Sequence, residues 1–254
     1  MLNLPEEAPR GLPDIPPLQG RLELRNVNFA YGNDPHPFIK NINLTVNPGE
    51  AISIEGANSS GRTTLLLLIL ALLRPQSGQI LLDGNDIFQF DPVSVRNEVS
   101  LVSHNAPLYS GNLVENMTNY QWGDMVQEAL NLAEDLGLDE EIKVLPEGYD
   151  TKVGGSTVER IPAGVRQRVA IVRALVDKPK LILFDEANLS LDAMADKRLQ
   201  QLLLRLKGDC SMILVSHRAD VLALADRHFV MVDGELREKL RADAGDTADM
   251  RGQR

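Results

Sequence analysis

Short apolar stretches alternate with segments of helical periodicity along most of this chain. Residues 21–31 alternate apolar and polar side chains, as a strand with one buried face does. Residues 51–56 form a short, mostly apolar stretch, and residues 180–186 contain a continuous apolar run that ends in two carboxylates, as is typical of a buried strand of a parallel sheet. The pattern predicts strands at 21–31, 51–56, 180–186 and 211–217, a strand followed by a turn at 42–49 and at 79–86, a hairpin at 228–236, and helices at 63–73, 124–138 and 165–176.

Polar residues close several of these strands. The strand at 51–56 leads into a loop rich in serine and glycine, the strand at 180–186 ends in two carboxylates, and the strand at 211–217 ends in serine and histidine. Apolar strands that alternate with helices indicate an α/β domain built on a mostly parallel sheet. In such a sheet the ligand site lies at the carboxyl edge, so these polar ends are candidates for one shared site.

The composition narrows the classes of function. The chain has 254 residues, 43% hydrophobic and 24% charged, so it can bury a sizeable core, and wholesale disorder is excluded. Acidic residues outnumber basic ones 36 to 26, and the formal net charge of −10 disfavours a general binder of nucleic-acid backbones. Cys210 is the single cysteine, so no disulfide can form within the chain.

Both ends of the sequence differ from the middle. Residues 1–20 hold 5 of the 14 prolines and are predicted to be an extended linker, while residues 237–254 are predicted to be a polar, disordered tail. The first twenty residues lack the pattern of a secretory signal peptide. The longest apolar run, Leu65–Leu73, is far shorter than the roughly 20 residues of a membrane span. The chain is therefore expected to reach a membrane through a transmembrane partner or an upstream membrane domain.

The most informative segment is GANSSGRT at 56–63, which fits the phosphate-loop pattern G-x-x-x-x-G-K-[ST] except that Arg62 replaces the lysine. A predicted strand precedes it and a predicted helix follows, as the pattern requires. Such a loop points backbone N–H groups at a phosphate, and Thr63 could supply a hydroxyl ligand for Mg²⁺. Taken alone, the segment fits an ordinary helix-capping turn equally well. The residues expected to contact the nucleotide here are Gly56, Asn58, Ser59, Ser60, Gly61, Arg62, Thr63 and Thr64.

Further candidates stand at the ends of other strands. Asp185 and Glu186 could hold Mg²⁺ and polarise an attacking water, although most isolated Asp-Glu pairs are solvated turns. His217 could reach a γ-phosphate, and Tyr31, 25 residues before Gly56, could stack on a nucleotide base. A lone histidine or tyrosine is more often structural, so these assignments depend on the phosphate loop.

In this order and spacing the motifs resemble the nucleotide-binding domain of ATP-binding cassette (ABC) transporters, over residues 21 to about 236. The stretches YSGNLVEN and PEGYDTKVG most resemble exporters, and the leader LNLPEE resembles the segment after an exporter's last membrane helix. The segments that carry the resemblance are FAYG around Tyr31, GANSSGRTT, LVSHNAPLYSGNLVENM (101–117), LPEGYDTKVG (145–154), RQRVAIVRALVDKPKLILFDEANLSLD (166–192) and ILVSHR (213–218).

The resemblance implies a P-loop NTPase fold, an ATP-binding core with an antiparallel β-subdomain near the N-terminus and an inserted helical subdomain at about 106–170. It implies ATP and Mg²⁺ as cofactors, with Thr63 and Asp185 on the metal, Glu186 as the general base and His217 on the γ-phosphate. In this family two domains face each other head to tail, each nucleotide lying between one phosphate loop and the other domain's signature segment. The implied partners are a transmembrane domain and a second nucleotide-binding domain, identical or not, at the cytoplasmic face of a membrane, with no nucleic acid.

Several residues that would touch the nucleotide depart from the family's pattern. Arg62 replaces the loop lysine, Ser59 stands where glycine is usual, and His104 replaces a glutamine. Arginine keeps the charge but is longer, planar and forked, so it is not equivalent to lysine. Ser59 adds a Cβ to a loop that needs a close approach of backbone to phosphate. These changes are expected to weaken the site built on this chain's own loop.

The signature segment is also altered. The family's LSGGQ becomes IPAGV at 161–165, where Gly164 alone matches, and Pro162 removes both a hydroxyl and a backbone N–H. The glutamate that the family usually has just before this segment is not found at its usual place in VGGSTVER (153–160). These changes are expected to weaken the site built on the partner's loop. Beside the phosphate loop, the resemblance assigns to the nucleotide Tyr31, His104, Ile161, Pro162, Ala163, Gly164 and Asp192.

Three interpretations follow from the sequence. The first is the ATP-binding domain of an ABC exporter with weakened nucleotide sites and reduced hydrolysis. The second is a pseudo-ATPase that binds ATP and serves as a structural or regulatory half of the transporter. The third is a soluble ABC protein of DNA repair or translation, which the acidic charge and the lack of a second cassette or long coiled-coil arms disfavour.

Overall fold

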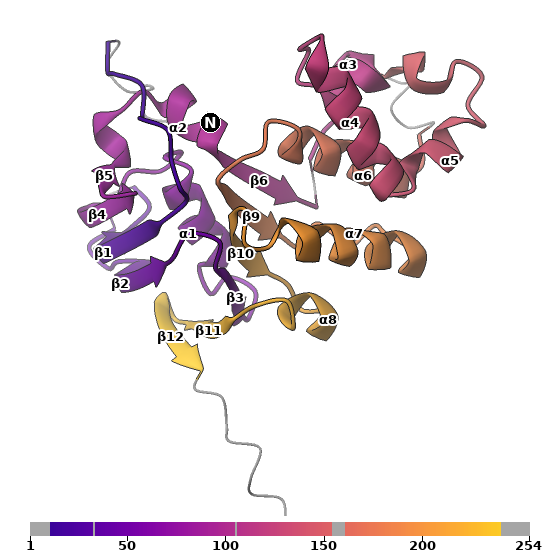
Figure 1. Cartoon of the computed structure of the whole chain (residues 1–254). Coiled ribbons are helices and arrows are strands. Elements are labelled where there is room, and N and C mark those ends of the chain that lie inside the picture. The colour runs from indigo at the N-terminus through magenta and orange to yellow at the C-terminus, as the bar shows by residue number, and fades with distance from the viewer. Residues whose placement is uncertain (1–10, 33, 105, 154–160, 240–254) are drawn as a thin grey trace, which may run out of the picture.

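The computed structural model describes residues 11–32, 34–104, 106–153 and 161–239. It confirms the predicted mixed α/β architecture, with one mostly parallel sheet, one antiparallel sheet and a separate group of helices (Figure 1). The six-stranded sheet has the order β12-β11-β3-β10-β9-β6, in which β12 alone is antiparallel to its neighbour. Its strands are β3 (Ala51–Gly56), β6 (Val99–Ser103), β9 (Leu181–Asp185), β10 (Ser211–Val215), β11 (Arg227–Val232) and β12 (Glu235–Lys239).

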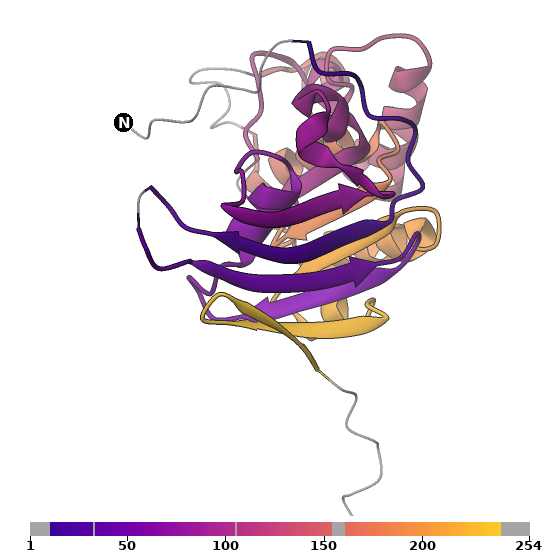
Figure 2. The same ribbon diagram turned by 90° about the vertical axis from the view of Figure 1, so that its left-hand side faces the viewer.

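The antiparallel sheet has the order β2-β1-β4-β5 and faces the viewer in Figure 2. Its strands are β1 (Leu22–Phe29), β2 (Ile39–Val46), β4 (Ser77–Leu82) and β5 (Asn85–Asp86). A small third sheet pairs β7 (Gly111–Asn112) with β8 (Lys152–Val153). The α-helices are α1 (Arg62–Ile69), α2 (Pro92–Glu98), α3 (Leu113–Met117), α4 (Asp124–Asp135), α5 (Leu138–Ile142), α6 (Ala163–Leu175), α7 (Ala193–Leu206) and α8 (Ala219–Leu222). Short 3₁₀ helices lie at Ile87–Gln89 and Gly148–Asp150.

The parallel strands separate two hydrophobic cores. Alternate residues of a strand point to opposite faces, so Leu183 joins one core while Ile182 and Phe184 join the other. This two-sided burial explains why the central strands are continuous apolar runs. One core lies between the two sheets, and the other lies between the parallel sheet and helices α3 to α7.

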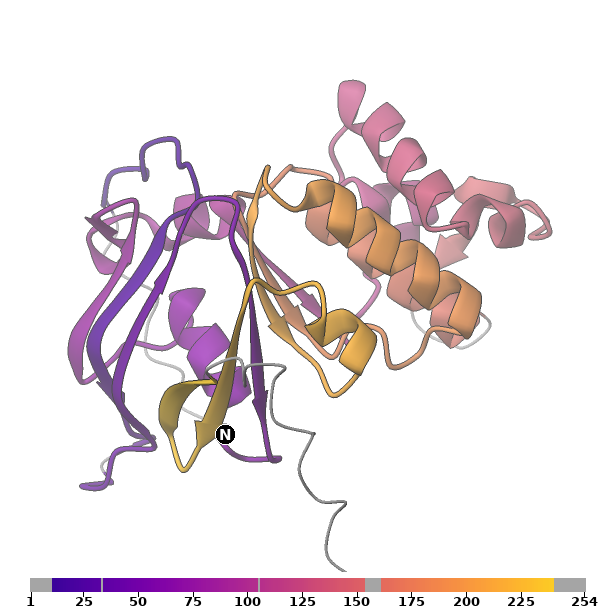
Figure 3. The ribbon, with the colours of Figure 1, turned by 60° about the horizontal axis from the view of Figure 1, so that its bottom comes forward.

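Helix α1 fills the space between the two sheets (Figures 1 and 3). Most of its surface is apolar and buried. Leu65, Leu66, Leu68 and Ile69 are at most 1% exposed. A helix that is apolar on all sides is stable only when it is enclosed by other elements. The position of α1, and with it the loop that precedes it, is therefore fixed by both sheets at once.

Several predicted boundaries shift in the structure. The helix expected at 63–73 ends at Ile69, and Ala71 then adopts a left-handed backbone with φ of 55°. The strand and turn expected at 79–86 are found as β4 and a turn at Asp83 and Gly84, and a second short strand, β5, follows the turn. The helix expected at 124–138 stops at Asp135, because Gly137 is left-handed and α5 begins directly after it. The sequence pattern predicted none of α2, α3, α7, α8 and β6.

The ends of the folded unit also differ from the prediction. Residues 237–239 belong to β12, which pairs with β11, so the start of the predicted tail is a strand, while 240–254 lie outside the described residues. Residues 1–10 of the predicted linker lie outside them too. The helical region extends beyond 170, since α6 continues to Leu175. Within the described part of the chain, no helix combines the length and the apolar character needed to cross a membrane.

Residues 11–20 form no regular strand or helix, yet they are packed against the domain rather than hanging free. Ile15 and Leu18 are 8% and 6% exposed and lie in the core between the sheets. The carboxylate of Asp83 accepts hydrogen bonds from the backbone N–H groups of Gln19, Gly20 and Arg21. The predicted linker is therefore part of the folded unit over its second half.

This packing predicts the effect of truncating Leu18. We expect Leu18→Ala to lower the free energy of unfolding by about 2–4 kcal/mol, because it removes buried methyl groups and leaves a cavity. Gln19→Ala is the matched control, since Gln19 is exposed and its backbone N–H is retained, and it should change stability by less than about 0.5 kcal/mol. Denaturant titration measures both, and equal effects would contradict the assignment of this segment to the core.

Candidate nucleotide site

The loop between β3 and α1 is shaped by two glycines. A Cβ on Gly56 would lie 2.6 Å from the carbonyl oxygen of Met231 and 2.6 Å from Ser60 Oγ. A Cβ on Gly61 would lie 2.8 Å from Ile39 Cδ1, and Gly61 has a φ of 108°, which favours glycine. Gly61 is also the N-cap of α1 and offers no side chain to the first N–H groups of the helix. The first turn of α1 therefore has backbone donors available for an anion.

The loop and the carboxyl ends of the parallel strands enclose a cavity of about 350 Å³. It brings together most of the residues predicted for the nucleotide, although they come from four distant parts of the sequence. Phe38 and Leu189 also line it and were not predicted, because no motif marks either residue. The lining residues are Phe38, Asn58, Ser59, Ser60, Gly61, Arg62, Thr63, Thr64, His104, Asp185, Glu186, Leu189 and His217.

Two carboxylates enter this cavity from the end of β9. Asp185 and Glu186 are 9% and 8% exposed, and Asp185 Oδ2 accepts a hydrogen bond from Thr63 Oγ1 at 3.2 Å. Glu186 has a φ of 51°, a left-handed backbone that costs a residue with a Cβ about 1–2 kcal/mol. Its N–H donates to the carbonyl oxygen of Val215 at 3.0 Å, which ties the turn to the neighbouring strand β10. This hydrogen bond to the sheet stabilises the strained backbone conformation of Glu186.

Arg62 turns from the start of α1 toward these carboxylates. Its Nη1 lies 3.5 Å from Glu186 Oε1, and its Nη2 lies 3.2 Å from His217 Nε2. His217 Nε2 is also 3.3 Å from Glu186 Oε1, so the three side chains meet at one point. The Arg62 side chain is 10% exposed. The cation of the phosphate loop is therefore paired with the acidic end of the cavity.

An aromatic cluster lies beside the phosphate loop. The ring of Tyr31 packs edge-on against Phe29, with centroids 4.9 Å apart, and at a tilt against Phe38, with centroids 5.6 Å apart. The Tyr31 hydroxyl is 2.8 Å from Thr64 Oγ1, while the residue as a whole is 47% exposed. Tyr31 does not line the cavity, but Phe38 does. The cluster places an aromatic surface at the edge of the loop, where a base could stack.

The altered signature segment lies away from this cavity. Ile161 is buried, Pro162 is the N-cap of α6 without a side-chain hydrogen bond, and Arg166 Nη1 donates to the carbonyl oxygen of Ile161 at 2.6 Å. A second hollow of about 250 Å³ adjoins this helix start and His104; it is lined by His104, Ala106, Ala163, Arg166, Gln167 and Ser190. The expected absence of the family's glutamate falls mostly on 154–160, which lie outside the described residues.

Other predicted positions have structural contacts. Asp192 caps α7 by accepting from the N–H groups of Met194 and Ala195, each at 2.9 Å, and these bonds lower the pKa of its carboxyl group. Asp192 lines neither cavity, and Gly56 lies at the end of β3 without lining the main one.

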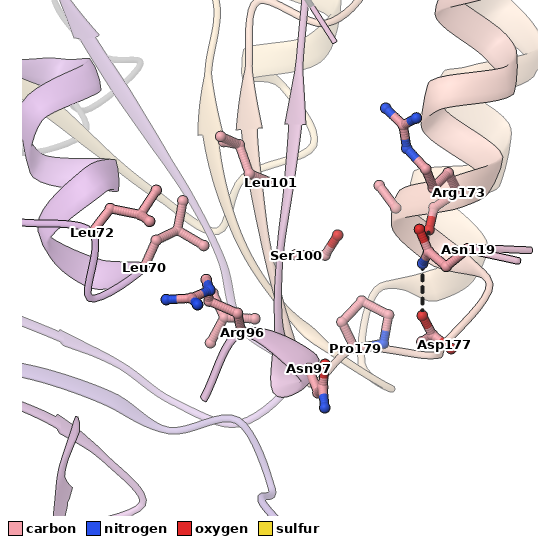
Figure 4. A pocket seen from close by; sticks show the side chains of 12 residues that line it. Leu70, Leu72, Arg96, Asn97, Ser100, Leu101, Asn119, Arg173, Asp177 and Pro179 are labelled. Atoms are coloured by element: carbon pink, nitrogen blue, oxygen red, sulfur yellow. Dashed lines mark hydrogen bonds between the residues drawn. The ribbon is translucent and has the colours of Figure 1, made fainter. Parts of the chain in front are cut away.

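A third hollow, of about 280 Å³, lies between the end of α1, the α2–β6 segment and the end of α6 (Figure 4). Asn119 Nδ2 donates to Asp177 Oδ2 at 3.0 Å there, and the guanidinium of Arg173 lies 4.7 Å from the ring centroid of Tyr109. No residue predicted to contact the nucleotide lines this hollow. The candidate nucleotide site is therefore the cavity at the phosphate loop.

The donor set of that cavity fits Mg²⁺. Mg²⁺ binds oxygen, keeps several waters, and is usually held by one or two protein oxygens together with phosphates. Thr63 Oγ1 and Asp185 Oδ2 already lie together, and among the described residues no three His, Cys, Asp or Glu side chains form a cage of their own. Two buried oxygens at the loop, Ser60 Oγ and Glu186 Oε2, have no hydrogen-bond partner within the described part of the chain. These atoms are suited to a phosphate and to a water, respectively.

Comparisons with known proteins agree with this geometry. A sequence model of the family described as "ABC transporter" matches residues 39–188. The alpha-hemolysin translocation ATP-binding protein HlyB of Escherichia coli O157:H7 is 34% identical over 238 residues, which are 94% of this chain and 34% of that protein. The leukotoxin translocation ATP-binding protein LktB of Mannheimia glucosida is 34% identical over 239 residues, again 94% of this chain and 34% of that protein. The chain thus spans about a third of the length of these relatives.

A solved structure described as a bacterial Atm1-family ABC exporter with ATP bound has the same fold. The superposition has a TM-score of 0.84 at 27% sequence identity and covers 91% of this chain and 41% of that one.

The close packing around the loop predicts a difference between two glycine substitutions. Gly84 has a φ of 83°, and no atom lies within 4 Å of where its Cβ would stand, so Gly84→Ala should cost only the backbone strain, about 1 kcal/mol. Gly61→Ala adds a collision with Ile39 and should cost at least about 1 kcal/mol more. Thermal unfolding of both variants measures the difference, and equal melting temperatures would refute the close approach at Gly61.

Proposed function

The chain belongs to the ABC transporter family, and from this premise we propose that it is the ATP-binding domain of an exporter, coupling ATP binding and hydrolysis to transport. One observation carries the proposal: the phosphate loop, the Thr63–Asp185 pair, Glu186 and His217 converge on a single cavity. A helix N-terminus, a hydroxyl beside a carboxylate and a buried second carboxylate are the parts that phosphoryl transfer from a nucleotide requires. The names of the relatives, translocation ATP-binding proteins and an exporter, support the same function.

Each side chain then has a role. Thr63 and Asp185 would hold Mg²⁺, which would neutralise charge on the phosphates when bound. The N–H groups of the first turn of α1 would bind phosphate oxygens, and the aromatic cluster at Tyr31 would contact the base. Glu186 Oε2, buried and unpartnered among the described residues, would accept a hydrogen bond from the attacking water and take its proton. His217 would donate from Nε2 to the γ-phosphate.

We propose that the nucleotide sites are weakened. Ser59 has a left-handed backbone with φ of 65°, which the glycine usual in the family adopts without strain. Arg62 is engaged with Glu186 and His217, so it is a poorer ligand for phosphates than a lysine aimed at them. Ile161, Pro162, Ala163 and Gly164 lie outside the cavity, which fits a role toward the nucleotide of a second domain.

The partners follow from this arrangement. A second nucleotide-binding domain, identical or not, would complete each site, and a transmembrane domain would hold the chain at the cytoplasmic face of a membrane. The acidic composition argues against nucleic acid as a partner. A second candidate function is a pseudo-ATPase that binds ATP without turnover and acts as a structural or regulatory half. The specific observation that favours it is Pro162, which leaves the start of α6 without a side-chain cap and without one of its N–H donors.

Nucleotide binding tests the shared basis of both candidates. We expect the isolated domain to bind ATP in a Mg²⁺-dependent way, more weakly than is usual for the family, and to remain mostly monomeric with ATP even as Glu186→Gln. The reason is that the segment at 161–165 lacks most of the groups that would grip a partner's phosphates. Calorimetry and light scattering measure the two properties. No heat at millimolar ATP would refute nucleotide binding, and a tight ATP-dependent homodimer would refute the weakened signature.

The rate of ATP hydrolysis distinguishes an ATPase domain that drives transport from a pseudo-ATPase that binds ATP without turnover. Loss of one donor to a developing oxyanion can slow a reaction on the order of 10²–10³-fold, so we expect slow turnover by the unaltered chain. Groups that act as a unit are not additive, so Arg62→Lys alone, or LSGGQ restored at 161–165 alone, should recover little. The combined variant should recover most of the rate.

Steady-state phosphate release compares these chains, with Asp135→Asn, outside the cavity, as the control. A fast rate in the unaltered chain would overturn the proposal of weakened sites. Full recovery with Arg62→Lys alone would overturn the role given to the signature segment.

A further inference from the structure

We propose that Arg62 is the specificity-determining residue of this site: it joins Glu186 and His217 in one network that a nucleoside triphosphate must open and a nucleoside diphosphate leaves closed. The inference rests on the proposed function, because it takes the cavity to be a nucleotide site. It goes further by stating which nucleotide the site prefers. A lysine at this position would offer one ammonium nitrogen in place of the two guanidinium nitrogens that contact Glu186 and His217.

The donors and acceptors of the network fix the direction of each hydrogen bond. A guanidinium carries five N–H donors and no acceptor, so it must donate to both of its neighbours. It donates to Glu186 Oε1 across 3.5 Å and to His217 Nε2 across 3.2 Å. His217 Nε2 therefore accepts in this contact, and the proton of the neutral ring stands on Nδ1. The same Nε2 lies 3.3 Å from Glu186 Oε1, but it cannot accept from Arg62 and donate to Glu186 at once.

Contact with a nucleotide needs the opposite tautomer of His217. To contact a γ-phosphate, His217 must donate from Nε2, because phosphate oxygens only accept. Arg62 therefore holds His217 in the tautomer that cannot make this contact. The His217 side chain is 57% exposed, so water can exchange its proton between the two nitrogens once Arg62 withdraws.

Burial makes the network costly to open. The side chains of Arg62 and Glu186 are 10% and 11% exposed, so their attraction is screened less than that of a surface pair. Glu186 Oε2 has no hydrogen-bond partner within the described part of the chain, and Arg62 is the cation that contacts the other oxygen, Oε1. Moving Arg62 onto a phosphate would leave Glu186 buried and facing a like charge. This cost falls on any ligand group that draws Arg62 away.

The third phosphate of a nucleoside triphosphate is the group whose binding requires Arg62 to leave Glu186. A phosphate loop cradles the α- and β-phosphates with backbone N–H groups, and its side-chain cation reaches toward the β- and γ-phosphates. A diphosphate can thus bind to the loop and to α1 while Arg62 stays with Glu186 and His217. A triphosphate extends toward the two residues that Arg62 occupies and must replace both contacts. The site consequently favours the diphosphate, compared with the same site carrying a lysine.

The network can be tested in the full chain without nucleotide. Nitrogen-15 NMR of histidine-labelled protein in mildly alkaline buffer reports the tautomer of each of its four histidines, His36, His104, His217 and His228. We expect His217 to be the Nδ1–H tautomer and to shift toward Nε2–H in Arg62→Met. His228, whose Nδ1 lies 2.8 Å from Ser53 Oγ outside the cavity, should be unchanged and is the internal control. An Nε2–H tautomer of His217 in the unaltered chain would overturn the proposal.

Affinity gives the second readout. We expect MgADP to bind at least as tightly as the magnesium complex of adenosine 5′-(β,γ-imido)triphosphate, which is not hydrolysed. Glu186→Gln should shift the ratio of the two dissociation constants about tenfold toward the triphosphate analogue, the effect of about 1.4 kcal/mol. Asp135→Asn is the matched control, since it removes the carboxylate charge from the Arg205–Asp135 pair far from the loop, and it should leave the ratio unchanged.

The possible outcomes distinguish a failure of this proposal from a failure of the proposed nucleotide-binding function on which it rests. The triphosphate analogue, but not ADP, should convert His217 to the Nε2–H tautomer. Binding of both nucleotides with no difference in the His217 signals would overturn the role of Arg62 while leaving the nucleotide site intact. Failure of the chain to bind either nucleotide would overturn the proposed function and this inference together. A ratio insensitive to Glu186→Gln would overturn the inference alone.

Discussion

The enclosure of α1 between two sheets is the constraint on which the site depends. Its leucines are buried from both sides, so the helix cannot slide or rotate without exposing apolar surface. The loop in front of it is equally fixed, because Gly61 is in contact distance of Ile39 on β2 and Gly56 of Met231 on β11. The antiparallel sheet thus sets where the first turn of α1 points. Only then can a side chain of that turn meet Glu186 and His217, which come from the ends of β9 and β10.

Much of this arrangement is predictable from sequence. The central strands β3, β9 and β10 are predicted because burial on both faces requires continuous apolar runs, and their polar ends mark the site. Helix α7 was not predicted, although Asp192 as a cap followed by Leu199 and Leu202 is a sufficient signal. Strand β6 carries two serines in five residues and lies at the edge of its sheet, so its pattern is too polar to be recognised.

The contacts that decide the chemistry could not be predicted from local pattern. Arg62 meets residues 124 and 155 positions further along the chain, and the phosphate-loop pattern says only that a lysine is missing there. Phe38 lies just before β2, in the connection from β1, and its side chain lines the cavity, but no motif in the sequence marks it. The left-handed backbones of Ser59 and Glu186 likewise have no sequence signal, since neither residue is a glycine. Sequence identified the participants, while tertiary packing decided which of them touch.

The charges of the side chains that line this cavity limit how it can bind a polyphosphate. Among its lining residues Arg62 is the one lysine or arginine, and it faces two buried carboxylates, Asp185 and Glu186. The three side chains together carry a net charge of −1 when both acids are ionised, so they repel a polyphosphate. Attraction would then come from the N–H groups of α1 and from Mg²⁺, which Asp185 would help to hold. A single arginine cannot neutralise Glu186 and a terminal phosphate at once, because it would have to leave one buried charge unpaired. A terminal phosphate and Glu186 therefore compete for one side chain, Arg62.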